Sequence, residues 1–217
     1  MKFILVFLLV VLFIAAAFNA PARNTRSNFL VFTLSSQNVR ELIPQTSPIC
    51  RENNDCPLEP GDILIRRYLT SRTSMMSMIF KMYFTHSAIY LGDGKIIEAM
   101  GVEPNKKDEV KVTNLDNSDW IQEPLENLVI FRPNAQVARI HTALNHIEEI
   151  ASDPKYRFGI ATLNRGDKLV TCADLIFDQF KSEGIIQDDT SPAIITPDYL
   201  FWYAANNPDR FSLVWTR

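Results

Sequence analysis

The sequence predicts an α+β domain in which an antiparallel sheet, open or curved into a half-barrel, packs against helices. Two observations predict this class. Between residues 62 and 133, short apolar runs alternate with polar residues and are separated by turn-forming residues, which is typical of antiparallel strands. From residue 134 onward, apolar residues recur at the 3.6-residue spacing of helices. The strands therefore come first in the chain and the helices later.

The individual elements follow from local patterns. The first strand is predicted at residues 62–68, where DILIRRY alternates between apolar and polar residues. Residues 85–99 are predicted to form a β-hairpin, because glycines and an aspartate separate two apolar runs. Further strands are predicted at residues 109–115, 128–133 and 211–215. Helices are predicted from apolar spacing and end signals at residues 134–151, 171–184 and 197–207.

The composition is that of a globular protein. The 217 residues are 47% hydrophobic and 22% charged, so the chain is long enough to bury a core as a single domain. The formal net charge is −3, and no run of lysines or arginines stands out. We therefore expect neither nucleic-acid binding nor polybasic attachment to lipid.

The N-terminus has the layout of a secretory signal peptide. Lys2 is followed by an apolar run of 16 residues, Phe3–Phe18, and then by small residues. We interpret residues 1–20 as a signal peptide, with an uncleaved signal anchor as the alternative. An irregular lead-in at residues 21–56 and the main domain at residues 57–217 complete the expected organisation. The mature protein is expected to be secreted, periplasmic or in the secretory-pathway lumen, with no membrane span after cleavage.

The three cysteines fall into two groups. Cys50 and Cys56 enclose a short polar loop and are a candidate disulfide in an oxidising compartment. Cys172 is then left without a partner. In a secreted protein this indicates either a reactive thiol or a buried, inert cysteine.

The predicted hairpin carries a histidine near one end and a glutamate near the other. Side chains alternate along a strand, so the register decides whether they share a face. A two-residue turn would place Glu98 opposite Ile89, away from His86. A three-residue loop would place Glu98 opposite Ala88, on the face of His86. Gly94 suits the left-handed position of a three-residue loop, so we predict that His86 and Glu98 share a face.

A carboxylate beside an imidazole fixes the tautomer of the ring and raises its basicity, as in catalytic triads. On the hairpin alone, a solvent-exposed histidine and a surface ion pair involving the glutamate remain the alternative. Cys172 favours the catalytic interpretation, because it is predicted to be the first residue of a helix. Thr171 is a preferred N-cap and Asp174 completes the spacing of a capping box. The N–H groups and dipole of a helix N-terminus favour a thiolate and can bind an oxyanion.

Five stretches together resemble a known family. They are PGDIL (60–64), THSAIYLGDGKIIEA (85–99), YRF (156–158), TCADLI (171–176) and ITPDYL (195–200). In order and spacing they resemble the circularly permuted papain-like amidohydrolases, the YiiX/YaeF-like branch of the NlpC-type cysteine peptidase superfamily. The resemblance covers about residues 57–205, and the histidine precedes the cysteine in the chain, as it does in this branch.

The resemblance implies a permuted papain-like fold and a catalytic triad. Cys172 would be the nucleophile, His86 the general base and acid, and Glu98 the residue that orients the imidazole. It also implies that Tyr156 lines the cleft. Met82 belongs to a methionine-rich stretch before the histidine, which is either core packing or an apolar wall that binds substrate.

These features predict a cysteine hydrolase that cleaves an amide bond in a peptide, isopeptide or peptidoglycan-type substrate through an acyl-enzyme. Two alternatives remain open: a thiol-dependent acyltransferase or lipase acting on acyl esters, and a non-catalytic binding module on the same fold. No cofactor is expected. No metal is expected either, because His141 and His146 lie on different sides of their predicted helix.

Overall fold

The computed structural model describes residues 31–43, 57–68, 81–100, 109–118, 120, 128–159 and 168–216. The expected signal peptide at residues 1–20 and the candidate disulfide between Cys50 and Cys56 lie outside the described residues.

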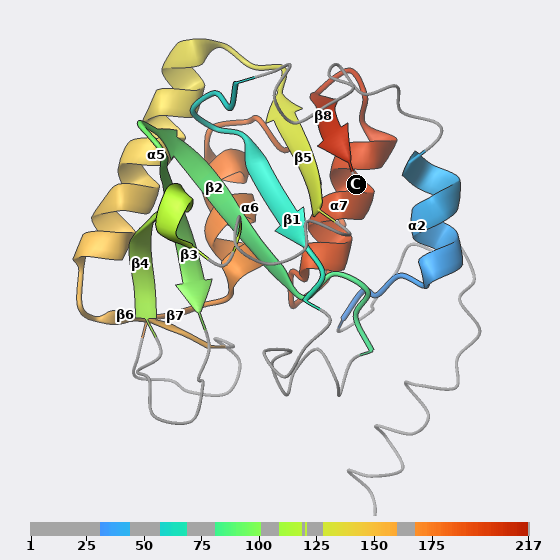
Figure 1. Ribbon diagram of the computed structural model, residues 1–217, viewed down its shortest axis with the longest axis horizontal. Helices are drawn as coiled ribbons and strands as arrows, with labels where there is room; N and C mark the ends of the chain where they lie inside the picture. Colours follow the sequence, from blue (N-terminus) through green and yellow to red (C-terminus); the bar gives the residue numbers. More distant parts are fainter. Residues whose placement is uncertain are drawn as a thin grey trace, which may run out of the picture.

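A six-stranded antiparallel sheet forms the centre of the molecule (Figure 1). Its strands stand in the order β4-β3-β2-β1-β5-β8. They are β1 (Ile63–Arg66), β2 (His86–Gly92), β3 (Lys95–Met100), β4 (Glu109–Asn114), β5 (Leu128–Pro133) and β8 (Phe211–Thr216). Each of the six was predicted from its alternating or apolar pattern, with ends within about two residues of those observed.

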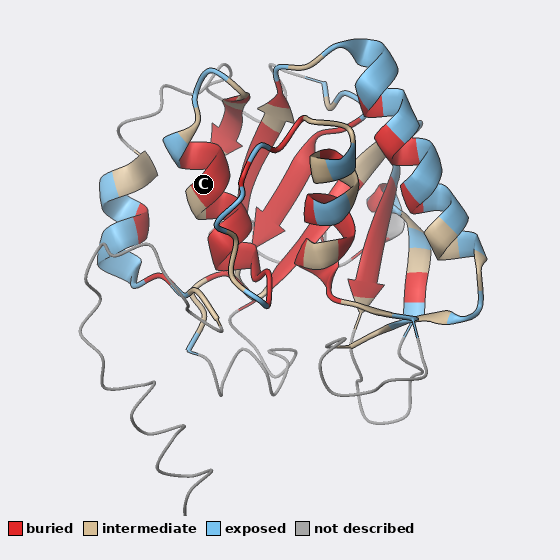
Figure 2. Cartoon of the chain, turned by 180° about the vertical axis from the view of Figure 1, so that it is seen from behind, coloured by how far each residue is buried: buried red, intermediate tan, exposed pale blue. Residues whose placement is uncertain are grey.

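The helices are gathered on one face of this sheet, as the two opposite views show (Figures 1 and 2). They are α5 (Val137–Ser152), α6 (Cys172–Ser182) and α7 (Pro197–Asn206). Five of the six strands precede these helices in the chain and β8 follows them, so the predicted α+β class is confirmed.

Four elements of the described residues were not predicted, one of which is the three-residue 3-10 helix η2 (Leu115–Asn117) that follows β4. A short helix, α2 (Ser36–Leu42), lies within the segment expected to be irregular, and the Ser35 side chain caps it. Two three-residue strands, β6 (Tyr156–Phe158) and β7 (Lys168–Val170), pair in parallel as a separate small sheet. Strands this short carry too few residues for an alternation to be recognised.

Strand alternation divides the buried side chains between the two faces of the sheet. Ile63, Ile65 and Ile89 belong to the larger core, which they share with the buried faces of α5, α6 and α7. Leu64 and Ala88 point the other way, into a smaller apolar cluster. The side chains of the central strands are thus buried on both faces of the sheet (Figure 2).

The β2–β3 hairpin has the predicted pairing but not the predicted turn. Asp93 and Gly94 form a two-residue turn in which both residues have positive φ, 50° and 69°, as a type I′ turn requires. The three-residue loop expected from the sequence is therefore wrong. A β-bulge between Tyr90 and Gly92 shifts the register by one residue, so that Ile89 pairs with Ile97. Continued along the strands, this pairing brings Glu98 opposite Ala88.

No helix in the described ranges is both long enough and apolar enough to cross a membrane.

Candidate active site

Cys172 is the first residue of α6, as predicted. The predicted capping box is present: the Thr171 hydroxyl accepts from the Asp174 N–H at 3.0 Å, and the Asp174 carboxylate accepts from the Thr171 N–H at 3.2 Å. The same carboxylate accepts from the Ile195 N–H at 3.2 Å. These contacts fix the end of the helix and therefore the position of Cys172, a residue that is 5% exposed.

In the first turn of α6, two backbone donors have no acceptor among the described residues. The N–H groups of Asp174 and Leu175 bond to Thr171. Within the described part of the chain, the N–H groups of Cys172 and Ala173 have no acceptor. Unpaired N–H groups at a helix N-terminus favour negative charge nearby, on a thiolate or on an oxyanion.

His86 and Glu98 lie on one face of the sheet and meet directly. The distance from His86 Nε2 to Glu98 Oε2 is 2.9 Å, and the two residues are 7% and 3% exposed. Nε2 is thereby committed to the carboxylate, so Nδ1 is the ring nitrogen left for other partners. The contact inferred from strand parity is present in the fold.

The Glu98 carboxylate accepts two further hydrogen bonds. The Trp120 indole donates to Oε2 at 3.0 Å, and the Thr113 hydroxyl donates to Oε1 at 2.7 Å. Burial raises the pKa of Glu98, but the hydrogen bond to His86, the charge of His86 and these two donors together lower it to about 2. The carboxylate is therefore ionised across the physiological pH range and is held in one orientation.

Aromatic rings surround the imidazole. The centroid of the Trp120 ring lies 5.3 Å from that of His86, and the Tyr68 ring lies 6.0 Å from it. Both aromatic side chains are themselves buried. Water is thus kept from the ring on these sides, which strengthens its interaction with the carboxylate.

The imidazole and the thiol shift each other's ionisation. Burial lowers the pKa of His86, but hydrogen bonds to Cys172 and Glu98 and their charges raise it to about 10. Burial raises the pKa of the Cys172 thiol, but the hydrogen bond and charge of His86, followed by the side chain and N–H of Ser87, lower it overall from 9.0. These opposite shifts favour a thiolate–imidazolium pair.

Of the five residues expected at the site, the structure brings three together: Cys172, His86 and Glu98. Tyr156 is half-buried at the start of β6, where the Lys168 ammonium lies 4.5 Å from its ring centroid. Met82 is half-buried in the segment before β2. The hydrogen bonds and ring contacts described for Cys172, His86 and Glu98 do not involve Tyr156 or Met82. The structure therefore does not place these two residues at the thiol.

Four residues of the site were not found from the sequence: Ser87, Thr113, Trp120 and Tyr68. In the observed register, β3 and β4 pair with Glu98 opposite Lys111 and Thr113 opposite Ile96, but the sequence does not fix that register. Given that register, the threonine falls on the face of Glu98. The other three carry no pattern that separates them from ordinary core residues.

The described residues contain no group of three or more metal-ligating side chains that could hold a metal ion. His141 and His146 are exposed on α5. Asp62 is fully buried and receives two hydrogen bonds of 2.8 Å from the Arg132 guanidinium, which ties β1 to β5. This agrees with a structural role for the aspartate.

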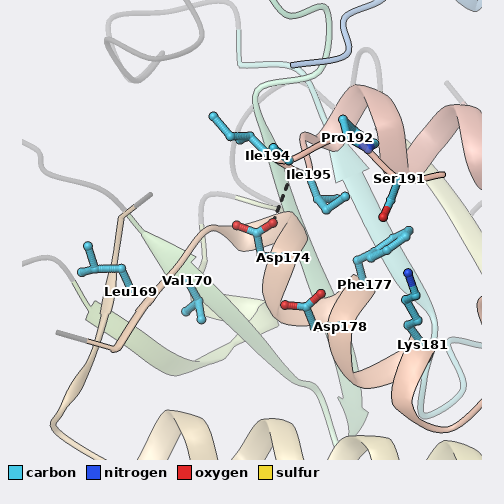
Figure 3. A pocket seen from close by; sticks show the side chains of 11 residues that line it. Leu169, Val170, Asp174, Phe177, Asp178, Lys181, Ser191, Pro192, Ile194 and Ile195 are labelled. Atoms are coloured by element: carbon cyan, nitrogen blue, oxygen red, sulfur yellow. Dashed lines mark hydrogen bonds between the residues drawn. The ribbon is translucent and has the colours of Figure 1, made fainter. Parts of the chain in front are cut away.

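A cavity of about 200 Å³ lies beside α6. Its walls are the end of β7, the outer side of α6, where Asp174 and Asp178 stand, and residues 191–195 (Figure 3). The hydrogen bond from Ile195 to Asp174 crosses this region. Cys172, His86 and Glu98 are not part of its lining, so we assign it no role in the chemistry of the thiol.

No protein-family model matches the chain, and no curated protein matches it. Among solved structures, the chain is similar to the metalloprotein YiiX from Escherichia coli O157:H7, with 15% sequence identity and a TM-score of 0.42. The match covers 73% of this chain and 88% of YiiX. At this level of similarity we assign neither a family nor an activity from it.

Proposed function

We propose that this protein is a cysteine hydrolase that cleaves an amide bond through an acyl-enzyme on Cys172. One observation carries the proposal: a buried thiol at a helix N-terminus is hydrogen-bonded to a buried imidazole, and a buried carboxylate accepts from the far nitrogen of that imidazole. These surroundings lower the pKa of the thiol overall. Inert buried cysteines have raised, not lowered, thiol pKa values. The substrate class is a peptide, an isopeptide or a peptidoglycan-type fragment.

In the first half of the reaction, the Cys172 sulfur attacks the amide carbonyl carbon, and the electron pair of the C=O bond moves to its oxygen. The unpaired N–H groups of Cys172 and Ala173 are the donors available to that oxyanion. When the C–N bond breaks, the His86 imidazolium gives its proton to the leaving nitrogen. A thioester and a free amine result.

In the second half, neutral His86 takes a proton from water, whose oxygen attacks the thioester carbon. The C–S bond breaks and the thiolate returns beside the imidazolium, with release of a carboxylic acid. Glu98 holds the Nε2–H throughout, so that Nδ1 faces the sulfur and the reacting water. The carboxylate stabilises the imidazolium and takes no proton itself.

The proposal extends to fold family and location. The resemblance of the five sequence stretches and the order of histidine before cysteine support a permuted papain-like fold of the NlpC type. The apolar N-terminus supports secretion or delivery to the periplasm or a secretory lumen.

A library of acylated amines and short peptides, incubated with the protein and followed by intact-protein mass spectrometry, tests the proposal. We expect an added acyl mass that is located on Cys172 and is absent in Cys172→Ser. His86→Ala should slow its formation by at least about 10²-fold, the usual contribution of general acid–base catalysis. Adducts from fatty esters but never from amides would contradict amide cleavage and favour acyl transfer. No adduct from either class would contradict both enzymatic functions.

A further inference from the structure

Ser87 lies next to His86 on β2 and is completely buried. Because side chains alternate along a strand, Ser87 faces the opposite side of the sheet from the imidazole. That side is the one covered by α6, whose first residue is Cys172. The serine and the histidine therefore approach the sulfur from two sides at the start of β2.

Apart from the Cys172 sulfur, the hydroxyl of Ser87 has no hydrogen-bond partner among the residues that the structure describes. A buried hydroxyl without a partner is costly, by about 1–3 kcal/mol, and few remain in a folded protein without a reason. The backbone of Ser87 pairs with Ile65 in the β1–β2 ladder, and that pairing needs no polar side chain. The strand position therefore does not explain why a serine stands here.

A serine hydroxyl rotates freely, so it can turn its hydrogen toward a charge that forms beside it. The charge available at this position is that of the ionised Cys172 sulfur. Alanine would fill nearly the same volume without leaving a polar atom unpaired. A serine stabilises the folded protein more than alanine here only if its hydroxyl donates a hydrogen bond to the ionised sulfur of Cys172.

We propose that the Ser87 hydroxyl is a catalytic group that donates a hydrogen bond to the Cys172 thiolate and holds the nucleophile ionised before substrate arrives. The inference rests on the proposed function, since it assigns a role in the same site. Two donors from one residue would then serve the sulfur, the hydroxyl and the backbone N–H of Ser87, and both lower the pKa of the thiol. His86 supplies the opposite charge from the other face.

The test is the ultraviolet absorbance of the thiolate as a function of pH, measured on the purified full chain, with Cys172→Ser as the blank. In Ser87→Ala we expect the midpoint of thiolate formation to rise by about one to two pH units, the value of one hydrogen bond to a charged group. His86 and the Ser87 N–H remain, so part of the depression should persist.

Ser118→Ala is the matched control, because Ser118 is also buried but its hydroxyl already donates to the Leu115 carbonyl at 2.7 Å. Its thiolate midpoint should equal that of the wild type. A depressed midpoint in the wild type that Ser87→Ala leaves unchanged would overturn this inference alone. A wild-type midpoint at the ordinary 9.0 would overturn the proposed function together with it.

Discussion

Replacing Glu98 by glutamine should lower the pKa of His86 without rearranging the site. The carboxylate accepts from three donors, two on Oε2 and one on Oε1. A glutamine keeps an acceptor for His86 and Trp120 if its oxygen takes the place of Oε2. Its NH₂ group then faces the Thr113 hydroxyl, which can accept instead of donating. The substitution therefore removes the negative charge and conserves the geometry.

The size of the effect follows from the loss of that charge. Hydrogen bonds to charged groups contribute about 1.5–3 kcal/mol and neutral ones about 0.5–1.5, so the imidazolium loses about 1–1.5 kcal/mol. Because about 1.4 kcal/mol corresponds to one pKa unit, the pKa of His86 should fall from about 10 by roughly one unit. The fall should move the alkaline limit of activity down, since the leaving amine needs the imidazolium proton.

Nuclear magnetic resonance of ¹³C-labelled histidine measures this directly. The chain has three histidines, and the signal that disappears in His86→Ala identifies the residue. We expect a titration near pH 10 in the wild type and about one unit lower in Glu98→Gln. A wild-type His86 that titrates at its ordinary 6.5, or a titration that Glu98→Gln leaves in place, would refute the reasoning.

Three further predictions concern stability, each measured by urea unfolding. Asp198→Asn should cost about 1–3 kcal/mol in free energy of unfolding. The buried carboxylate accepts from the N–H groups of Leu34, Tyr83 and Phe84, and an amide group would leave one of these donors unpaired. An unchanged unfolding midpoint would contradict this. The folded-state pKa of Glu98, about 2, lies below its ordinary 4.5, so the stability it contributes is fully present above pH 4.5 and is lost as the pH falls toward 2. Glu98→Gln should therefore show a shallower loss of stability in acid, and parallel acid slopes would count against the assignment. Thr171→Ala should cost about 0.5–2 kcal/mol in free energy of unfolding through loss of the α6 cap. Ser35→Ala is the comparison, because it removes the cap of the short exposed α2. An equal loss of stability in both variants would contradict a special contribution of the α6 cap.

Features encoded by local signals could be predicted from the sequence. Helix α6 begins at Cys172 because a threonine and an aspartate stand at capping-box spacing, and the structure has both hydrogen bonds. The same holds for the strands with regular alternation and for α5, whose buried side chains repeat at helical spacing. In α2 the box is closed by Asn38, a neutral amide, where α6 has a carboxylate, so the signal of α2 was weaker.

The contact between His86 and Glu98 was predicted correctly from a turn that does not exist. A two-residue turn alone would have separated the two side chains by one residue of register. The bulge between Tyr90 and Gly92 restores the pairing that a three-residue loop would have given. Gly92, which closes this bulge, has a φ of 110°, a conformation that only glycine adopts readily.

The remainder of the site depends on tertiary packing that leaves no pattern in the chain. β3 and β4 are joined by residues 101–108, a connection too long for turn geometry to fix the register that brings Thr113 to the glutamate. Trp120 reaches Glu98 across 22 positions from a segment without periodicity. In the sequence, Ser87 has the pattern of an ordinary strand residue, and only the packing of α6 against β2 brings it to the thiol.

The central claim is that Cys172 is a thiolate because His86 lies beside it as an imidazolium. Thiolate absorbance against pH, in the wild type and in His86→Ala, tests it most directly and needs no substrate. The account predicts a thiolate midpoint well below 9.0 in the wild type and a return toward 9.0 in His86→Ala. A wild-type thiol that ionises at 9.0, or a low midpoint that survives loss of the imidazole, would contradict it.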